Sequence, residues 1–266
     1  MIKSEIINKY KAEDISQHGK NTLGYVGIAL NFSYPNIDSI ESAFYNLIFE
    51  EFPIRTIRPT KEHSILISNE TTGSNKFAFE EKDINDYIYV HKENKYQLIL
   101  NDFTLDLRCE DPFNNYTTFE DFGKIFIEMY GFLKKAAFTI SQNSIVKNRA
   151  LFVRKINKIE YNNESLNLLN EDYTKEYNLF DDIADCRNTS VYKEISSKET
   201  DGSQIIIRLG TMLQIDKKYL MYDFQVFKDN PINLSDNIES DLNDFSTKIY
   251  NLYCYMLGDK FITKVK

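Results

Sequence analysis

The sequence is poor in the residues that most enzymes use to hold phosphate groups and metal ions. Only nine glycines and three histidines occur among its 266 residues. The glycine-rich dinucleotide and P-loop patterns are absent, as is the G-x-S-x-G elbow of serine hydrolases. His18, His63 and His91 lack the spacing of zinc ligands. We therefore expect no metal and no cofactor, and the sequence identifies no catalytic residue.

Cysteine is scarce and apolar runs are short. Cys109, Cys186 and Cys254 are odd in number, far apart and without C-x-x-C spacing, which argues against a disulfide framework and fits a reducing compartment. No apolar run approaches the ~18 residues that a membrane span needs. The polar N-terminal stretch lacks the apolar core of a secretory signal. We expect a cytoplasmic protein with no membrane partner.

Charge is unevenly distributed along an acidic chain. The formal net charge is −8, which argues against non-specific coating of nucleic acid. Residues 162–185 include seven carboxylates and one lysine. Just before them, five basic residues occur between Lys147 and Lys158 with no acid among them. The two segments are therefore expected to pair with each other, although a local basic patch remains open.

The stretch Lys95–Tyr161 predicts a helix lying across a sheet. Its flanks, Tyr96–Arg108 and Ile145–Tyr161, are rich in strand-forming residues. Between them, apolar residues three and four apart fall on one helical face. They are Phe119, Phe122, Phe126, Met129, Leu133 and Ala136. Thr117 with Glu120 predicts a capping box at the start of this helix.

Shorter patterns predict the remaining elements before this helix. Tyr25–Tyr34 alternates apolar and polar residues as a strand does. A helix is expected after it, with Asp38 as N-cap and Glu41 three residues on. An antiparallel meander should follow, with a polar turn at Lys82–Asn85. Its expected strands are Ser64–Asn69, Lys76–Glu81, Asp86–His91 and Tyr96–Arg108.

The pattern as a whole predicts an α+β fold with antiparallel sheets and three principal helices. The expected units are an N-terminal lobe, 1–161, an acidic connector, 162–187, and a C-terminal lobe, 188–266. One integrated domain is the alternative. In the last lobe, Asp201-Gly202 predicts a hairpin turn between strands.

The basic strand supplies the main candidate binding residues. Assuming regular alternation, Lys147, Arg149 and Lys155 share one face, and Arg154 and Lys158 share the other. We expect Arg154 or Asn157 to be partly buried and hydrogen-bonded, with Asp216 or another carboxylate as partner. Contact with a phosphate group or a protein is the alternative to internal pairing. Arg108, on the preceding strand, completes the candidate set.

Four carboxylates near Arg108 raise the question of a nuclease metal site. They are Asp102, Asp106, Glu110 and Asp111. Asp102 and Asp106, four apart, would share one face of a continuous strand and could face a cation. Because the sequence identifies no matching lysine, ordinary solvent-facing carboxylates are the preferred interpretation.

The last predicted helix is a candidate association surface. Its stripe of Ile238, Leu242, Phe245, Ile249, Leu252 and Met256 alternates steps of four and three. Tyr250, Tyr253 and Leu257 widen the apolar arc. Packing on a second sheet explains one face, and the wider arc leaves surface for a partner. A homodimer or a protein partner is therefore expected here.

The strand Leu151–Tyr161 also carries a family resemblance. It resembles the Arg-Tyr-Ile-Asn-Arg-Ile signature of a sporadically distributed bacterial family of unknown function, whose members have about this length. The matching residues are Arg154, Ile156, Asn157 and Ile159, with Lys155 in place of the tyrosine and Lys158 in place of the second arginine. Upstream, Asn101–Arg108 resembles the family's Arg-Phe-x-x-Asn-Trp-Arg stretch, although Asp106 and Leu107 replace its Asn and Trp. The resemblance implies an accessory gene of mobile or defence loci and carries over no catalytic residue.

Three functions remain open from the sequence. The first is a non-enzymatic intracellular component that binds a protein partner or itself. The second is a nucleic-acid-binding or nuclease component that uses the basic strand 147–158. The third is a sensor with a small-ligand pocket between sheet and helix.

Overall fold

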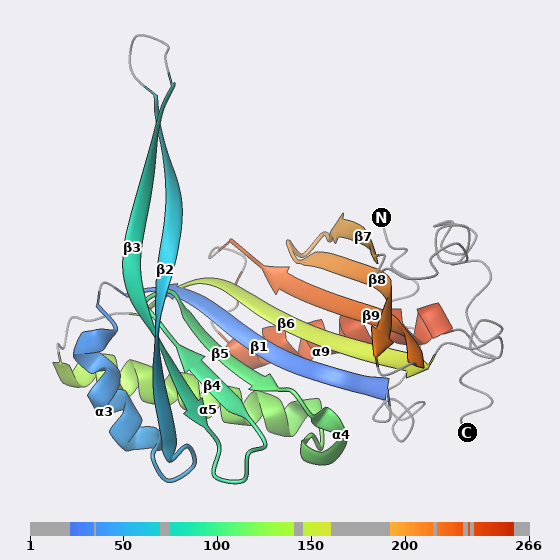
Figure 1. Ribbon diagram of the computed structural model, residues 1–266, viewed down its shortest axis with the longest axis horizontal. Coiled ribbons are helices and arrows are strands. Elements are labelled where there is room, and N and C mark those ends of the chain that lie inside the picture. Colours follow the sequence, from blue (N-terminus) through green and yellow to red (C-terminus); the bar gives the residue numbers. More distant parts are fainter. Residues whose placement is uncertain are drawn as a thin grey trace.

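The computed structural model describes residues 22–34, 36–69, 75–140, 146–160, 192–214, 217–230, 234 and 237–257. Within them, nine antiparallel strands form one sheet in the order β2-β3-β4-β5-β1-β6-β9-β8-β7 (Figure 1). The predicted α+β class is confirmed. The strands are β1 (Leu23–Ser33), β2 (Ile54–Asn69), β3 (Asn75–Val90), β4 (Gln97–Leu100), β5 (Thr104–Cys109), β6 (Lys147–Glu160), β7 (Tyr192–Lys198), β8 (Gln204–Gln214) and β9 (Lys217–Lys228).

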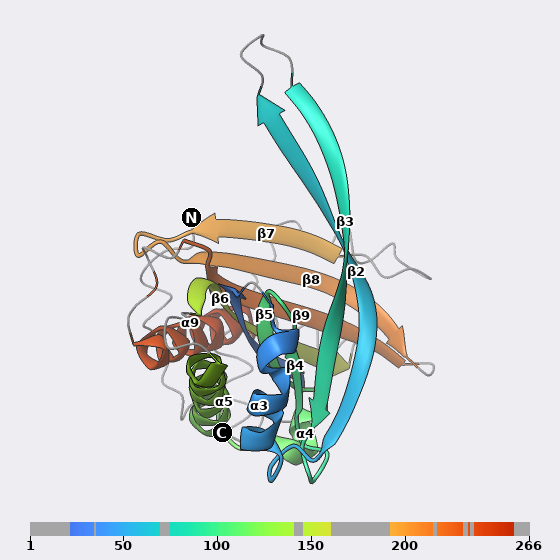
Figure 2. The same ribbon diagram turned by 90° about the vertical axis from the view of Figure 1, so that its left-hand side faces the viewer.

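The principal helices of the described chain all lie on one side of this sheet (Figure 2). They are α3 (Asp38–Ile48), α5 (Phe119–Ile140) and α9 (Ile238–Leu257), and a four-residue helix, α4 (Pro112–Asn115), precedes α5. α5 lies between the other two and contacts both. One face of the sheet therefore holds the hydrophobic core, and none of the described helices covers the other.

Strand β1 lies at the centre of the core. Its buried apolar residues alternate with less buried ones, as predicted. Val26, Ile28, Leu30 and Phe32 are at most 1% exposed. β1 pairs with β5 on one side and β6 on the other, so that Ile28 lies between Leu107 and Val153. Each of these fully buried side chains contributes about 1.5–3 kcal/mol through removal from water.

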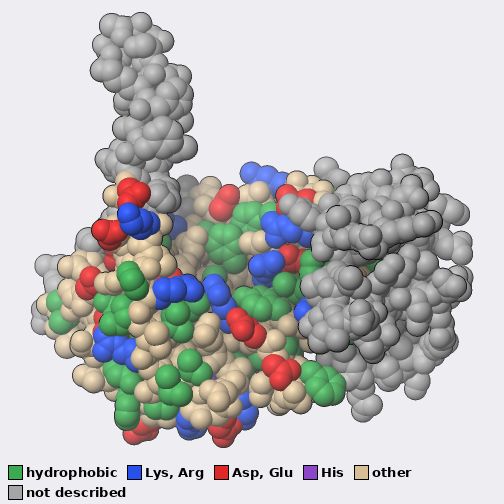
Figure 3. Space-filling model, in the orientation of Figure 1, with side chains coloured by type: hydrophobic (Ala, Val, Ile, Leu, Met, Phe, Trp, Pro, Cys, Tyr) green, Lys and Arg blue, Asp and Glu red, His purple; other side chains and the backbone are tan. Residues whose placement is uncertain are grey.

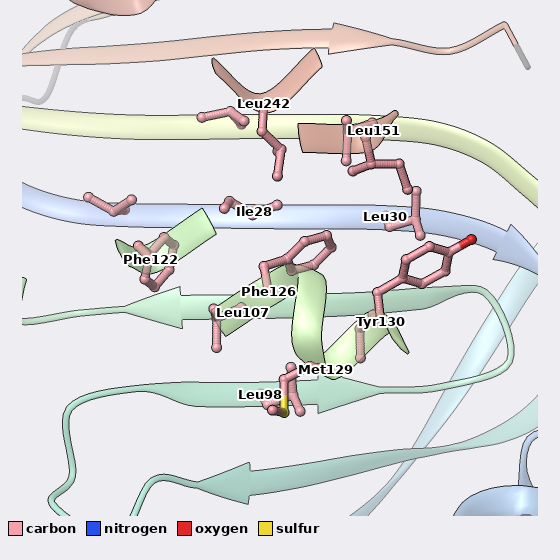
Figure 4. Close-up of a cluster of buried hydrophobic side chains, with 14 of the residues drawn as sticks. Ile28, Leu30, Leu98, Leu107, Phe122, Phe126, Met129, Tyr130, Leu151 and Leu242 are labelled. Carbon is pink, nitrogen blue, oxygen red and sulfur yellow. The ribbon is translucent and has the colours of Figure 1, made fainter. Parts of the chain in front are cut away.

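Helix α5 covers the central strands with the face that its sequence pattern predicts. Phe126, Met129 and Leu133 are at most 1% exposed. Figure 4 shows Phe126 and Met129 directed toward the strands that carry Leu107 and Leu98. Side chains from the two layers thus fill the space between the helix and the sheet.

The caps of two helices differ from the prediction. At α3, Asp38 Oδ1 accepts a bond from the Tyr87 hydroxyl (2.6 Å), and no side-chain cap forms. Glu41 is buried, accepting bonds from Tyr89 (2.8 Å) and Arg55 (2.6 Å). Donors on β2 and β3 bind both carboxylates in place of the backbone N–H groups of the helix. The capping box predicted there is therefore wrong.

At α5 the capping residue lies one position later than predicted. The Asp121 backbone N–H donates to Thr118 Oγ1 (3.1 Å), and Thr118 Oγ1 donates to the Asp121 carboxylate (2.7 Å). Two threonines, Thr117 and Thr118, precede this helix, and two acidic residues, Glu120 and Asp121, lie in its first turn. The three-residue spacing of a capping box therefore fits both pairs equally well. The predicted pair of Thr117 and Glu120 is therefore replaced by the next pair along the chain.

The predicted antiparallel meander is confirmed as β2-β3-β4-β5, but its strand bounds differ from the prediction, since two of the strands are long and two are short. β2 and β3 each run for 16 residues, and the turn predicted at Lys82–Asn85 lies inside β3. Pro59 lies within β2, which tolerates it because β2 is at the edge of the sheet. Conversely, the predicted strand Tyr96–Arg108 divides at Asn101, whose side chain accepts the N–H groups of Phe103 and Thr104 (3.0 and 2.9 Å).

The two halves of the chain share the sheet. β6 pairs with β1 from the first half and with β9 from the second. The predicted turn at Asp201-Gly202 lies between β7 and β8, with Gly202 at a φ of 81°. The predicted acidic connector, 162–187, lies outside the described residues. Its pairing with the basic strand stays a prediction.

Candidate functional site

The sheet face opposite the helices is the candidate site, and we call it the open face. In Figure 1 the strands pass in front of α5 and α9, so Figure 3 views this face, where basic, acidic and hydrophobic side chains are interleaved. The paired positions across the strands show which residues share it. The open face is defined here by Tyr25, Gly27, Asp106, Arg108, Phe152, Arg154, Glu194, Arg208, Asp223 and Phe227.

A chain of ion pairs crosses four strands of the open face. Arg154 of β6 holds Asp223 of β9 through Nε–Oδ1 and Nη2–Oδ2 bonds of 2.9 and 2.7 Å. The Asp223 side chain is 2% exposed and also lies 3.4 Å from Arg208 of β8. Arg208 in turn donates to Glu194 of β7 (2.7 Å). The prediction that Arg154 bonds a carboxylate is confirmed, with Asp223 as the partner; Asp216 is outside the described residues.

A second ion pair lies on β5. Arg108 donates from Nε to Asp106 Oδ2 (2.7 Å), two residues away on the same face. Burial of Asp106 raises the pKa of its carboxyl, and the hydrogen bond from Arg108 opposes that shift. Arg108 is therefore engaged within the sheet, as Arg154 is.

The carboxylates weighed as a nuclease site are not brought together. Asp102 lies in the turn between β4 and β5, where it accepts the Ile37 N–H (3.2 Å), and so it does not share a strand face with Asp106. Among the residues that the structure describes, no group of three or more metal-ligating side chains occurs.

Tyr25 covers the gap between the two arginine pairs. Gly27 is paired with Arg108 on one side and Arg154 on the other. A Cβ added to Gly27 would lie 2.5 Å from the Tyr25 hydroxyl, so that the tyrosine ring occupies the space a side chain would take. The Arg154 guanidinium carbon lies 5.8 Å from the ring centre. Burial raises the pKa of Tyr25 to about 12, so it stays neutral.

An aromatic pair adjoins these charges. Phe152 of β6 and Phe227 of β9 stack with ring centres 5.2 Å apart and an angle of 16° between their planes. Both are partly exposed. The open face thus combines arginines with aromatic rings, the residue types that are enriched at the centres of protein interfaces.

Lys155 and Asn157 point to the helix side of β6. Lys155 Nζ donates to Ser246 Oγ of α9 (2.9 Å) and lies 4.5 Å from the Phe119 ring of α5. Burial lowers the pKa of this amine to about 7. Asn157 is 4% exposed and accepts a bond from Thr22 (3.3 Å). The structure thus separates these two candidates from Arg108 and Arg154.

Lys147 does not share a face with Lys155, contrary to the prediction. The pairing of β1 with β6 shifts between Asn31 and Phe32, leaving Arg149 as an extra residue in a bulge. A bulge reverses the alternation beyond it. Lys147 pairs with Ser33 and lies at the far end of the open face, and both basic side chains are exposed.

The association surface predicted on α9 is partly contradicted. Tyr253 is 4% exposed, packs edge-on against Tyr222 and Phe224, and shares a 2.7 Å hydrogen bond with Thr22. It belongs to the core, because α9 contacts both the sheet and α5 and so needs a wide apolar arc. Tyr250 is half-buried, and the Leu257 side chain is outside the description.

Sequence reasoning missed Gly27, Glu194 and five further members of the open face. The five are Tyr25, Phe152, Arg208, Asp223 and Phe227. A signal existed, since each alternates with buried apolar residues and therefore falls on the opposite side of its strand. Which of them meet depends on the order of strands, which alternation does not give.

Comparison with known proteins gives the site no precedent. No family model matches the chain, and neither a curated protein nor a solved structure matches it. None of the described helices is long and apolar enough to cross a membrane.

Proposed function

We propose that this chain is a non-enzymatic binding component of the cell interior that contacts a protein through the open face. The observation that supports it is the series of ion pairs in which carboxylates of the sheet neutralise Arg154 and Arg208. These pairs lie beside the partly exposed rings of Phe152 and Phe227. Cys109 and Cys254 are free and buried, in keeping with a reducing compartment.

The charge pattern favours a protein over a nucleic acid. Within the ion pairs of the open face, three arginines, at 108, 154 and 208, are balanced by three carboxylates, at 106, 194 and 223. Lys147 and Lys158 lie on the same side of the sheet and are not members of these pairs. A phosphate that took Arg154 away from Asp223 would leave a buried carboxylate poorly paired, and breaking such a pair costs about 3–5 kcal/mol. Nucleic-acid surfaces instead present basic groups that phosphates neutralise. A protein with mixed charges can add contacts without disrupting these pairs.

The aromatic pair is expected to contribute most of the binding free energy. Phe152 and Phe227 expose part of their rings beside charged groups, and their removal from water by a partner is favourable by ~25 cal/mol per Å² of apolar surface. The surrounding ion pairs form the polar rim found around such centres. Binding should therefore depend more on the two rings than on any single charge.

Nucleic-acid binding is the second candidate. The observation that favours it is that arginines and aromatic rings share one sheet face, as in sheet surfaces that stack unpaired bases. For the sensor hypothesis, the space between sheet and α5 is filled by side chains such as Phe122, Phe126 and Met129. A ligand there would have to displace core residues, which makes the sensor the weakest of the three.

The family resemblance belongs to the same proposal. Arg154 and Asn157, two of the four matching signature residues, anchor β6 to β9 and to Thr22. A structural role of this kind accounts for a signature without catalytic residues. We propose that the chain belongs to that bacterial family and serves a mobile or defence locus, where its binding partner is encoded nearby.

Binding assays with proteins encoded by the neighbouring genes test the proposal. The double variant Phe152→Ala, Phe227→Ala should weaken binding at least ~10-fold. Phe138→Ala is the matched control, since Phe138 is 58% exposed on α5, on the helix side. Salt titrations with single-stranded DNA and RNA test the alternative. Nucleic-acid binding that the double variant abolishes, without binding to any neighbour-encoded protein, would overturn the proposal in favour of the second candidate.

A further inference from the structure

Strand β2 is one edge of the described sheet. It comes first in the strand order and pairs there with β3 alone. In Figure 2, β3 and α3 both lie on one side of the lower part of β2. The side chains from Ile54 to Lys61 are described, and those of Ile54 and Ile57 are about half exposed. This part of the edge therefore has a surface on which a further strand can pair.

The backbone groups of alternate residues point outward along this edge. The His91 N–H donates to the Tyr96 carbonyl (2.9 Å), in the register that pairs β3 with β4. Because the backbone groups of successive residues in a strand point to opposite sides, Ile88 of β3 directs its groups toward β2. Its partner there, Thr56, directs its own groups back toward β3. The N–H and C=O groups of the residues on either side of Thr56 therefore point away from the sheet.

Two prolines bound these outward-pointing groups. Pro53 and Pro59 each lie three residues from Thr56, and neither has a backbone N–H. Proline in an edge strand normally limits the addition of further strands. Between the two prolines, the outward N–H groups are those of Arg55 and Ile57. The edge thus offers a short window that is symmetric about Thr56.

We infer that two copies of this chain pair through their β2 edges, antiparallel about a two-fold axis at Thr56. About this axis, Arg55 of each copy faces Ile57 of the other, so that every outward N–H of the window reaches a carbonyl. Pro53 faces Pro59, and the ladder ends where no N–H is present. An extended peptide from another protein could use the same edge, but only β2 itself places Pro59 opposite Pro53. This edge is separate from the open face, and the inference goes beyond the proposed function.

Exposed apolar side chains lie along the same edge. Ile54 and Ile57 are 52% and 49% exposed. Phe49, at the end of α3, is 52% exposed and packs edge-on against Tyr45, with ring centres 5.6 Å apart. The Arg55 guanidinium carbon lies 5.3 Å from the centre of the Tyr45 ring, which places these rings beside β2. Pairing of two copies removes part of this apolar surface from water, which favours the dimer.

Internal ion pairs neutralise the arginines of this edge. Arg55 donates to Glu41 (2.6 Å), whose side chain is 2% exposed, and Arg58 donates to Asp86 (2.8 Å). Like charges placed opposite each other on neighbouring strands are destabilising. Because each arginine has its own carboxylate, two copies of β2 can pair without bringing unpaired positive charges together.

A charge exchange at the axis tests the pairing by sedimentation velocity. The contact involves only about five residues of each strand, so that weak association is expected, and the wild-type chain should change from monomer to dimer between ~10 and ~500 µM. Thr56→Lys and Thr56→Glu each place like charges opposite each other and should raise the dissociation constant at least ~10-fold. An equimolar mixture of the two variants should associate again, because lysine then faces glutamate.

Controls for this experiment use a site away from β2. Thr247 is exposed on α9, and Thr247→Lys and Thr247→Glu should leave the dimer unchanged. A wild-type chain that stays monomeric at ~500 µM overturns the inference. So does a mixture of the two Thr56 variants that associates no better than either variant alone.

Disulfide formation under mild oxidation measures the register. Thr56→Cys faces its own counterpart, with Cα atoms about 4.5 Å apart, and should form a covalent dimer. Ile54→Cys and Arg58→Cys should crosslink with each other in a mixture but not with themselves, since equivalent residues of the two copies lie ~13 Å apart. The wild-type chain, which has three cysteines, is the control. Equal crosslinking of all three single variants, or none by Thr56→Cys, overturns the inference.

The open-face variant separates this inference from the proposed function. Phe152→Ala with Phe227→Ala should dimerise as the wild type does, because neither ring lies at the β2 edge. Loss of the dimer in this variant, with the Thr56 variants unaffected, would assign self-association to the open face and overturn the pairing of β2.

Discussion

Arg154 of β6 and Asp223 of β9 form a two-point ion pair, with bonds of 2.9 and 2.7 Å, although 69 residues separate them in sequence. The pair crosses the junction between the first and second halves of the chain. The Asp223 side chain is 2% exposed and the Arg154 side chain 44%, so that the aspartate is buried against the sheet while the arginine is partly in contact with solvent.

The first prediction is that Arg154→Ala destabilises the protein by about 1–3 kcal/mol. Asp223 keeps the 3.4 Å contact with Arg208, which is why the loss should fall below that of an isolated buried pair. Urea unfolding measures it. Arg149→Ala, which removes the same charge from the exposed bulge, should change the free energy of unfolding by less than ~0.5 kcal/mol. Equal effects of the two substitutions would contradict the structural role of the pair.

The second prediction concerns the helix that covers the central strands. Phe126→Ala should lower the free energy of unfolding by about 3–5 kcal/mol, because it removes a fully buried ring and leaves a cavity. Phe138→Ala, on the exposed part of the same helix, is the control. Thermal melting of both variants checks the difference, and an unchanged melting temperature for Phe126→Ala would show that the ring is not in the core.

The third prediction concerns the close approach of Tyr25 to Gly27. Gly27→Ala should cost ~1 kcal/mol, because the new methyl group displaces the end of a partly exposed ring rather than backbone. In a Tyr25→Ala background the same substitution should cost nothing measurable. A double-mutant cycle gives the coupling energy. Coupling near zero would place the Tyr25 ring away from Gly27.

The sequence correctly predicted the strand and the helix whose buried residues recur at a regular spacing. β1 and α5 show this, since the alternation from Val26 and the three-and-four spacing from Phe119 depend on adjacent residues. The open face could not be predicted, because Arg154 and Asp223 meet only through the order of strands. The extra residue Arg149 forms a bulge, so that Lys147 lies on the face opposite to the one that regular alternation predicts. The polar residues Lys82–Asn85 suggested a turn, because a polar segment inside a long strand has the same local composition as a polar turn.

The last prediction follows from the amine of Lys155, which lies between α5, α9 and the sheet. The amine contacts the Ser246 hydroxyl and the Phe119 ring, and burial lowers its pKa from 10.5 to about 7. The unfolded chain therefore binds one more proton than the folded chain between pH 7 and the ordinary pKa of lysine. Stability contributed by this group should rise with pH through that window, since unfolding then requires proton uptake. Lys155→Met should remove the rise and increase the free energy of unfolding at pH 7, because the methionine can occupy the site without desolvating an amine. Urea unfolding of the wild type and of Lys155→Met at pH 7, 8 and 9 gives the slope as a difference between the two, which cancels the other titrating groups. Lys158→Met, on the opposite side of the same strand, removes an equal charge and should leave the slope in place. A wild-type slope equal to that of Lys155→Met would show that the amine is solvated and charged in the folded protein.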